Sequence, residues 1–267
     1  MINKLNDLKI CSDLSSNLAK LVGSKEILDN FSHSPKDVME YALSHTRDEL
    51  KNDFASQIGL WEGFTLGEHT ESVMTFFEEN FVDTLACSKN TRAIMNLIIF
   101  CHDIGKAEEK RKELSGHFVA PIEKFELYNI KTLKFFEDLN LEPQKNAQLA
   151  LFITNITQKL ELATTSYYIR GNDYALEILD DFAKNLLKEN DFDCSTQNID
   201  ALSTIARVLQ TCDSGAYTTY GKTRNAITNL YRPNLNKEWT KGFVLTKEGY
   251  RFKKDAPKKE FTQEQSL

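Results

Sequence analysis

The stretch "AIMNLIIFCHDIGK", residues 93–106, begins as a mostly apolar run and ends on polar and charged side chains. A helix over this run puts Ile98 four residues before His102, and Ile99 four residues before Asp103. Both polar side chains therefore start from the buried side of the helix. Polar groups at an inward-facing helix end cost free energy unless a partner satisfies them. A bound metal ion would do so, and so would a hydrogen-bond network within the protein.

The segment after Thr65 places a histidine on another apolar face. Thr65 and Glu68 have the spacing of a capping box, which predicts a helix that begins near Leu66. Val73 follows His69 by four residues, so the two side chains share one face of that helix. The imidazole of His69 is therefore predicted to point into the core.

A third apolar stripe ends at Asp213. Ile205 and Leu209 precede this aspartate by eight and four residues in the segment "NIDALSTIARVLQTCD". Three helices are thus predicted to aim two imidazoles and two carboxylates at one core. Such a mixed nitrogen and oxygen site suits Mn, Fe(II), Ni, Co or Zn, and Mg less well. The alternative is that each of the four is a polar core residue satisfied by hydrogen bonds.

The order of these residues, H…HD…D with the pentapeptide "HDIGK", resembles the signature of the HD-domain superfamily. Members of that superfamily are helical, metal-dependent phosphohydrolases, and "HDIGK" is common in its phosphodiesterase and nucleotidase branches. The resemblance covers roughly residues 60–220. It implies that one divalent metal ion is held by four ligands, namely His69, His102, Asp103 and Asp213. It also implies that Lys106 contacts a substrate phosphate, a role that suits a compact ammonium charge one turn from the metal.

The region after the HD pair lacks the extra histidines of the branches that use two metals. Only His117 follows residue 103, and the predicted helix pair over residues 121–160 contains no imidazole. That region offers Glu126, Tyr128 and Asn155 instead. A single metal ion is therefore predicted. The same absence argues against cyclic dinucleotide phosphodiesterases with several metals and against HD-fold oxygenases with a dinuclear iron site.

Three residues are predicted to act in catalysis. Asp103 could orient the attacking water, and Lys106 would offset the charge of the phosphate. His117 could protonate a leaving group because an imidazole titrates near neutral pH. Its alternative role is that of an exposed loop histidine.

The segment "SGAYTTYGKTR" after Asp213 supplies further candidates for binding the substrate or cofactor, namely Tyr217, Lys222 and Arg224. Gly215 in the same segment would let the backbone turn close to a ligand. A second set of cations flanks the HD pair and comprises Lys106, Lys110, Arg111, Lys112 and Lys124. Because glutamates alternate with them, they form either a phosphate funnel or an ordinary solvated face of mixed charge.

Helical periodicity dominates the chain, and the scarcity of glycine (11) and proline (5) among 267 residues disfavours an all-β fold. We therefore predict an all-α protein, an HD-domain-like helical bundle with extra N-terminal helices. Residues 1–57 hold two helices, over 12–31 and 35–55, that pack on the core. Residues 58–232 form the HD-like domain. Residues 233–267 form a tail with a strand–turn–strand pattern in "GFVLTKEGYRF" and a polar end predicted to be disordered.

Charge and composition restrict the partners. The net charge of −6 makes long duplex nucleic acid an unlikely ligand, and a phosphorylated small molecule or nucleotide fits better. The five cysteines are scattered, as expected for a reducing compartment. No apolar run nears the ~20 residues of a membrane span. These features predict a cytoplasmic protein, or an effector exported without an N-terminal signal, and leave a protein partner open.

Two functions follow from this sequence. The first is a nucleotide phosphatase or phosphodiesterase whose single metal ion, bound by two histidines and two aspartates, activates water. The second is a catalytically inactive HD-like module that binds a nucleotide or a protein partner through the same cleft. An effector or antitoxin-like protein acting on a host or phage target is a third, weaker option.

Overall fold

The computed structural model describes residues 14–57, 64–83, 85, 87–112, 114, 121–160, 163, 174–223, 243–246 and 249–252. Within these ranges it leaves out the side chains of residues 121, 174–177, 214, 217–223 and both strands. The described part is helical apart from one short pair of strands, which confirms the all-α prediction. None of the described helices combines the length and apolar character that crossing a bilayer requires.

Residues 14–22 are helical and precede the labelled elements. The α-helices that follow are α2 (Lys25–Phe31), α3 (Pro35–Ser44), α4 (Asp48–Ala55), α5 (Leu66–Phe77), α6 (Lys89–Cys101), α7 (Lys106–Arg111), α8 (Pro121–Asp138), α9 (Pro143–Thr154), α11 (Tyr174–Glu189) and α12 (Thr196–Thr223). Two π-helices, η1 (Glu78–Val82) and η2 (Asn155–Leu160), continue α5 and α9. The strands are β1 (Phe243–Thr246) and β2 (Gly249–Phe252).

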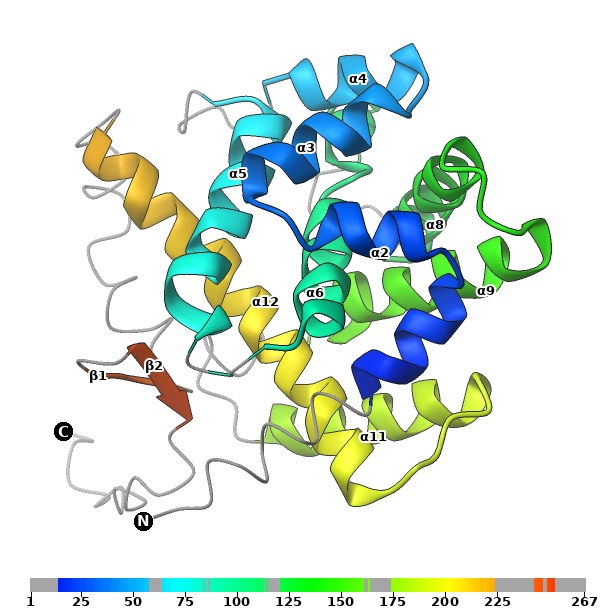
Figure 1. The fold of residues 1–267 in the computed structure, drawn as a ribbon, viewed down its shortest axis with the longest axis vertical. Helices are drawn as coiled ribbons and strands as arrows, with labels where there is room; N and C mark the ends of the chain where they lie inside the picture. The colour runs from blue at the N-terminus through cyan, green and yellow to red at the C-terminus, as the bar shows by residue number, and fades with distance from the viewer. Residues whose placement is uncertain are drawn as a thin grey trace, which may run out of the picture.

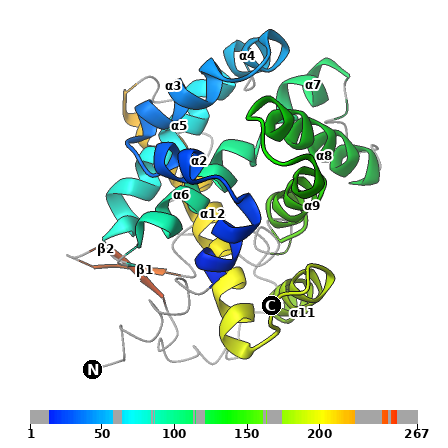
Figure 2. The same ribbon diagram turned by 45° about the vertical axis from the view of Figure 1, so that its right-hand side comes forward.

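The helix α6 lies at the centre of the fold and is buried along most of its length. A helix that is apolar on every side must be covered on every side, and α2, α3, α5, α9 and α12 supply that cover. The long helix α12 crosses the molecule beside α5 (Figure 1). Figure 2 shows α8 and α9 side by side, with α7 next to α8. The end of α6 therefore delivers the HD pair into the interior.

The N-terminal region contains more helices than the two that the sequence predicts. Gly23 adopts a φ of 70°, and its N–H bonds the carbonyl of Ala19, so the first helix ends there. Glycine enters this left-handed conformation without the steric cost that a Cβ brings. The predicted helix over 35–55 is likewise divided, because Arg47 starts α4 in extended conformation. Pro35 occupies the first position of α3, as predicted.

The helix α12 is longer than the predicted one, and it changes the role of Gly215. This glycine lies inside the helix and does not turn the backbone toward a ligand, so that prediction is wrong. A Cβ at Gly215 would stand 2.4 Å from Cζ of Phe76 in α5. The missing side chain therefore allows α5 and α12 to approach closely, which sets the distance between the helices that carry His69 and Asp213.

The C-terminal strand pattern forms the predicted hairpin, in which β1 and β2 pair antiparallel with Phe243 opposite Phe252. The residues predicted to be disordered after it lie outside the described part of the chain. A further difference from prediction is the π geometry of η1 and η2, which form the last turns of the helices predicted after Thr65 and over 143–160. Such segments are rare and occur often near functional sites.

Candidate metal centre

His69 is held by the first turn of α5. The predicted capping box is present: Thr65 Oγ1 accepts a bond from the N–H of Glu68 at 3.2 Å, and Glu68 Oε2 accepts one from the N–H of Thr65 at 2.8 Å. The ring of Phe64 stacks on the imidazole with centroids 5.4 Å apart. His69 is 1% exposed, so its ring is fixed inside the core, as the apolar stripe predicts.

His102 follows the last residue of α6 and is equally buried. Its Nδ1 lies 2.5 Å from the carbonyl oxygen of Ile99, which can only accept a hydrogen bond. The proton is therefore on Nδ1, and a neutral ring presents a lone pair at Nε2, the arrangement found in histidines that bind metals. Gln158 of η2 donates its amide to the carbonyl of His102 at 3.3 Å and so ties η2 to this corner.

The three helices bring their donor atoms together at this point. Nε2 of His69 lies 3.3 Å from Nε2 of His102 and 3.0 Å from Oδ1 of Asp213. The ligand atoms of His69, His102 and Asp213 all lie within 4.8 Å of one another.

Asp103 joins this group through the imidazoles. Its Oδ2 is 3.4 Å from Nε2 of His69 and 3.5 Å from Nε2 of His102. Neighbouring ligands of a metal with bonds of about 2.1 Å stand about 3.0 Å apart in octahedral and about 3.4 Å apart in tetrahedral geometry. The separations of 3.0–3.4 Å from His69 to His102, Asp103 and Asp213 lie in or near this range, and Nε2 of His102 is 3.9 Å from Oδ1 of Asp213. His69, His102 and Asp213, carried by separate helices, could hold a metal ion, and Asp103 lies beside them. We call His69, His102, Asp103 and Asp213 the metal centre.

The two carboxylates are held in their anionic form. Burial raises the pKa of Asp213, but the His102 and His69 imidazoles, when both are protonated, outweigh it and bring the pKa below its usual range. Burial likewise raises the pKa of Asp103, and Lys106, His102 and His69 together bring it well below that range. Although Nε2 of His69 is 3.0 Å away, Oδ1 of Asp213 is buried and accepts no hydrogen bond from any described residue. The chemistry of this donor set fits a divalent cation.

Lys106 stands at the rim of the metal centre. Its Nζ is 2.8 Å from Oδ2 of Asp103, and about a third of its side chain is exposed. It is the first residue of α7, and its N–H bonds the carbonyl of Asp103 at 2.9 Å. The ammonium of Lys106 is therefore partly open to solvent while it pairs with the less exposed carboxylate of Asp103.

The structure thus brings together five of the nine residues predicted for the site. Tyr217 and Lys222 lie in α12, four and nine residues after Asp213, but their side chains are outside the description. His117 and Arg224 lie outside the described residues altogether. Sequence reasoning missed Gln158, because a glutamine in an amphipathic helix gives no signal that its amide bonds the backbone of a ligand.

The cations that flank the HD pair are engaged within the protein. Lys110 bonds the carbonyl of Gln57 at 2.9 Å, while Arg111 pairs with Asp53 at 2.6 Å. Lys112, which follows the last residue of α7, pairs with Glu108 of that helix at 2.7 Å. Lys124 of α8 pairs with Glu109 of α7 at 3.3 Å. These contacts favour a mixed charged face over a phosphate funnel.

The chain matches no protein-family model, no curated protein and no solved structure. A function for the site must therefore be argued from its own geometry and from the motif. What the geometry offers is a buried group of two histidines and an aspartate able to hold a metal ion, with a second aspartate and a lysine beside it.

Proposed function

We propose that this protein is a metal-dependent phosphohydrolase that cleaves a phosphate monoester or diester, such as that of a nucleotide. The observation that carries the proposal is the convergence of His69, His102 and Asp213 within 4.8 Å of one another, with Asp103 beside both imidazoles and a lysine at the rim. The resemblance of the sequence to HD domains supplies the class of reaction. His69, His102, Asp103 and Asp213 would hold a single Mn, Fe, Ni, Co or Zn ion.

When bound, such an ion supplies Lewis acidity toward a phosphate oxygen and lowers the pKa of water. The side chains of the protein would position the ion, the water and the phosphate. Nδ1 of His102 is held by the Ile99 carbonyl, which keeps Nε2 as a lone pair directed at the centre. The carboxylate of Asp103, anionic at neutral pH, orients the attacking water through its oxygens. Lys106 compensates the negative charge that builds up on the phosphate as the bond to water oxygen forms.

Hydrolysis breaks the bond between phosphorus and the leaving oxygen, and that oxygen must gain a proton. His117 is the proposed donor of this proton. Tyr217, Lys222 and Arg224 follow Asp213 in the chain and are proposed to bind the rest of the substrate. Tyrosine can stack on a base, and the two cations suit a phosphate.

The experiment that tests the proposal is a screen of nucleotides and phosphorylated metabolites with Mn, Ni, Co, Mg and Zn in turn. Asp103→Ala is expected to abolish both the retained metal and the hydrolysis of bis(p-nitrophenyl) phosphate, with an unchanged helical circular dichroism spectrum. Asp181→Ala, a change at an exposed aspartate of α11, is the matched control and should keep both. Turnover in Asp103→Ala would contradict the catalytic assignment.

Elemental analysis separates this proposal from a module that only binds. A stoichiometric transition metal in purified protein supports the enzyme. Protein that stays free of metal after supplementation supports the binding module, in which the same cleft would hold a nucleotide or protein partner without hydrolysis.

A further inference from the structure

The short helix α7 has little apolar anchorage of its own. It has six residues, of which only Ala107 and Glu109 are buried. A helix of this length is unstable by itself, because nucleation costs more than so few hydrogen bonds return. Yet α7 begins at Lys106, so its placement fixes the lysine at the rim of the metal centre.

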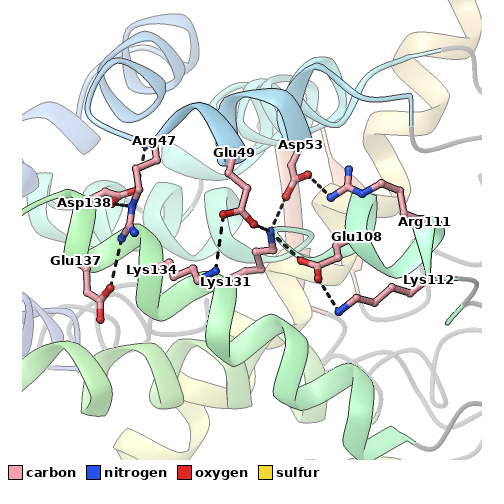
Figure 3. Close-up of polar contacts among 10 residues, drawn as sticks. All are labelled: Arg47, Glu49, Asp53, Glu108, Arg111, Lys112, Lys131, Lys134, Glu137 and Asp138. Carbon is pink, nitrogen blue, oxygen red and sulfur yellow. Dashed lines mark hydrogen bonds and ion pairs between the residues drawn. The ribbon is translucent and has the colours of Figure 1, made fainter.

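Ion pairs supply the missing anchorage (Figure 3). Lys131 of α8 is 3% exposed, and its Nζ lies 2.8 Å from Oε2 of Glu108 in α7. The same ammonium lies 3.1 Å from Oδ2 of Asp53 and 2.7 Å from Oε1 of Glu49, both in α4. Asp53 in turn pairs with Arg111 at the end of α7. We call Glu49, Asp53, Glu108, Arg111 and Lys131 the Lys131 network, and it ties α7 to both α4 and α8.

A second contact with α8 fixes the turn before α7. The hydroxyl of Tyr128 donates to Oε2 of Glu109 at 3.0 Å. Its ring also lies so close to Gly105 that a Cβ there would stand 2.6 Å from Cδ2. The HD turn and α7 thus lie as one piece against α8, whereas His69 and Asp213 are carried by α5 and α12.

The charges of the Lys131 network are strongly coupled. Burial lowers the pKa of Lys131, but Glu108, Glu49 and Asp53 outweigh it and raise the pKa above its usual range. Burial raises the pKa of Glu108, and Lys112 and Lys131 outweigh it and bring the pKa to about 2. Buried ion pairs are often no more stabilising than apolar residues of the same size. Stability alone therefore gives a weak reason for so many charges between three helices.

We infer that Lys131 and its partners Asp53 and Glu108 are positioning residues, which hold α7 so that the ammonium of Lys106 stands beside Asp103. The inference rests on the proposed function, because Lys106 matters only if a phosphate binds there. The Lys131 network is expected to govern phosphate binding through Lys106. Metal binding should persist, because His69, His102 and Asp213 are held by α5, α6 and α12.

The test compares four full-length proteins loaded with Mn: the wild type, Glu108→Gln, Lys106→Met and the double variant. Glu108→Gln keeps the size of the side chain but removes the charge that Lys131 pairs with. Two quantities are measured, the affinity for inorganic phosphate by calorimetry and kcat/KM for bis(p-nitrophenyl) phosphate. Manganese content and hydrogen exchange of residues 106–111 are followed in parallel.

We expect Glu108→Gln to lower kcat/KM by tenfold to about a hundredfold, the cost of a misplacement near 1 Å. Phosphate affinity should fall, exchange over residues 106–111 should rise, and the manganese content should stay at the wild-type level. In the Lys106→Met background, Glu108→Gln should cause no further loss, because both changes remove the same interaction. Glu123→Gln, at an exposed glutamate of α8, is the matched control.

Equal losses in the two backgrounds would overturn the inference, since they would show that Glu108 acts without Lys106. So would loss of manganese together with activity in Glu108→Gln. A wild-type protein that retains Mn but neither binds phosphate nor turns over any phosphoester would overturn the proposed function itself, and the inference with it. Lys131→Met is the more severe change. In conditions under which this variant is folded, its loss of kcat/KM should likewise not add to that of Lys106→Met.

Discussion

The metal centre is a buried group of ionisable side chains, and the Lys131 network is a group of charged side chains around the buried Lys131 and Asp53, yet the two groups are balanced differently. In the network, the ammonium of Lys131 lies within 3.1 Å of three carboxylates, and Arg111 adds a second cation. In the metal centre, two carboxylates and two imidazoles face one another, and Oδ1 of Asp213 accepts no hydrogen bond from a described residue. Burial disfavours an unpaired charge at Lys131 and Asp53 just as it does at the metal centre.

The difference teaches how to distinguish a structural cluster from a ligand site. Each carboxylate of the Lys131 network has a cation of the chain beside it, because Lys112 and Lys134 also pair with Glu108 and Glu49, and the cluster needs no charge from outside (Figure 3). A cluster of electron-pair donors at 3.0–3.9 Å from one another needs a positive charge from outside or protonated imidazoles. The two groups touch at α7, whose first residue Lys106 serves the metal centre and whose third, Glu108, belongs to the Lys131 network.

The largest expected effect is the loss of the proposed metal ion from the metal centre. Asp213→Asn replaces an anionic oxygen donor by a neutral amide, so we expect metal affinity to fall by more than about a hundredfold. Elemental analysis after dialysis measures it. Asp191→Asn is the control, because Asp191 is exposed and has a φ of 57° that asparagine also accepts. Full metal retention in Asp213→Asn would contradict the proposal that the metal centre, unlike the Lys131 network, is a ligand site.

Breaking the Lys131 network should cost stability instead. Lys131→Met leaves the buried carboxylate of Asp53 without its ammonium, so we expect the free energy of unfolding to fall by about 3–5 kcal/mol. Urea denaturation followed by circular dichroism measures the change. Lys134→Met alters a half-exposed lysine 3.8 Å from Glu49 and should cost at most about 1 kcal/mol. If the two substitutions lowered the free energy of unfolding equally, the ion pairs of Lys131 would contribute no more to stability than the exposed pair of Lys134.

Packing around the metal centre can be tested through Gly215. Gly215→Ala puts a methyl group against the ring of Phe76, and we expect a loss of about 1–3 kcal/mol from overpacking. Thermal unfolding measures it, and Phe76→Leu in the same chain should recover part of the loss by removing the ring. An alanine tolerated at no cost would mean that α5 and α12 are free to separate, with no fixed distance between His69 and Asp213.

The smallest expected effect is a pH dependence of the Lys131 network. The pKa of Glu108 is about 2 in the folded protein against an ordinary 4.5, so the folded state favours the ionised form. Its stabilisation is present above pH 4.5 and is lost as the pH falls through 4.5 toward about 2. Urea denaturation over this range should show a steeper decline for the wild type than for Glu108→Gln. Parallel curves would show that Glu108 ionises alike in the folded and unfolded protein.

The sequence by itself determined the helical class and the direction in which key side chains point. Helical periodicity and the capping box of Thr65 and Glu68 place His69, His102 and Asp213 on inward faces, because these signals act within two helical turns. The same local rules failed at glycines, because a glycine can either end a helix or lie inside one. Gly23 ended a helix that periodicity would have continued, while Gly215 remained inside one.

Only the tertiary structure decided how far apart the donor atoms stand and which charges neutralise one another. Lys131 and Asp53 are 78 residues apart in sequence, and nothing near either residue identifies its partner. Likewise, the amide of Gln158 bonds a carbonyl 56 residues away. Such contacts depend on how whole helices pack, because an ion pair or hydrogen bond is made over about 3 Å and a small change in helix position breaks it.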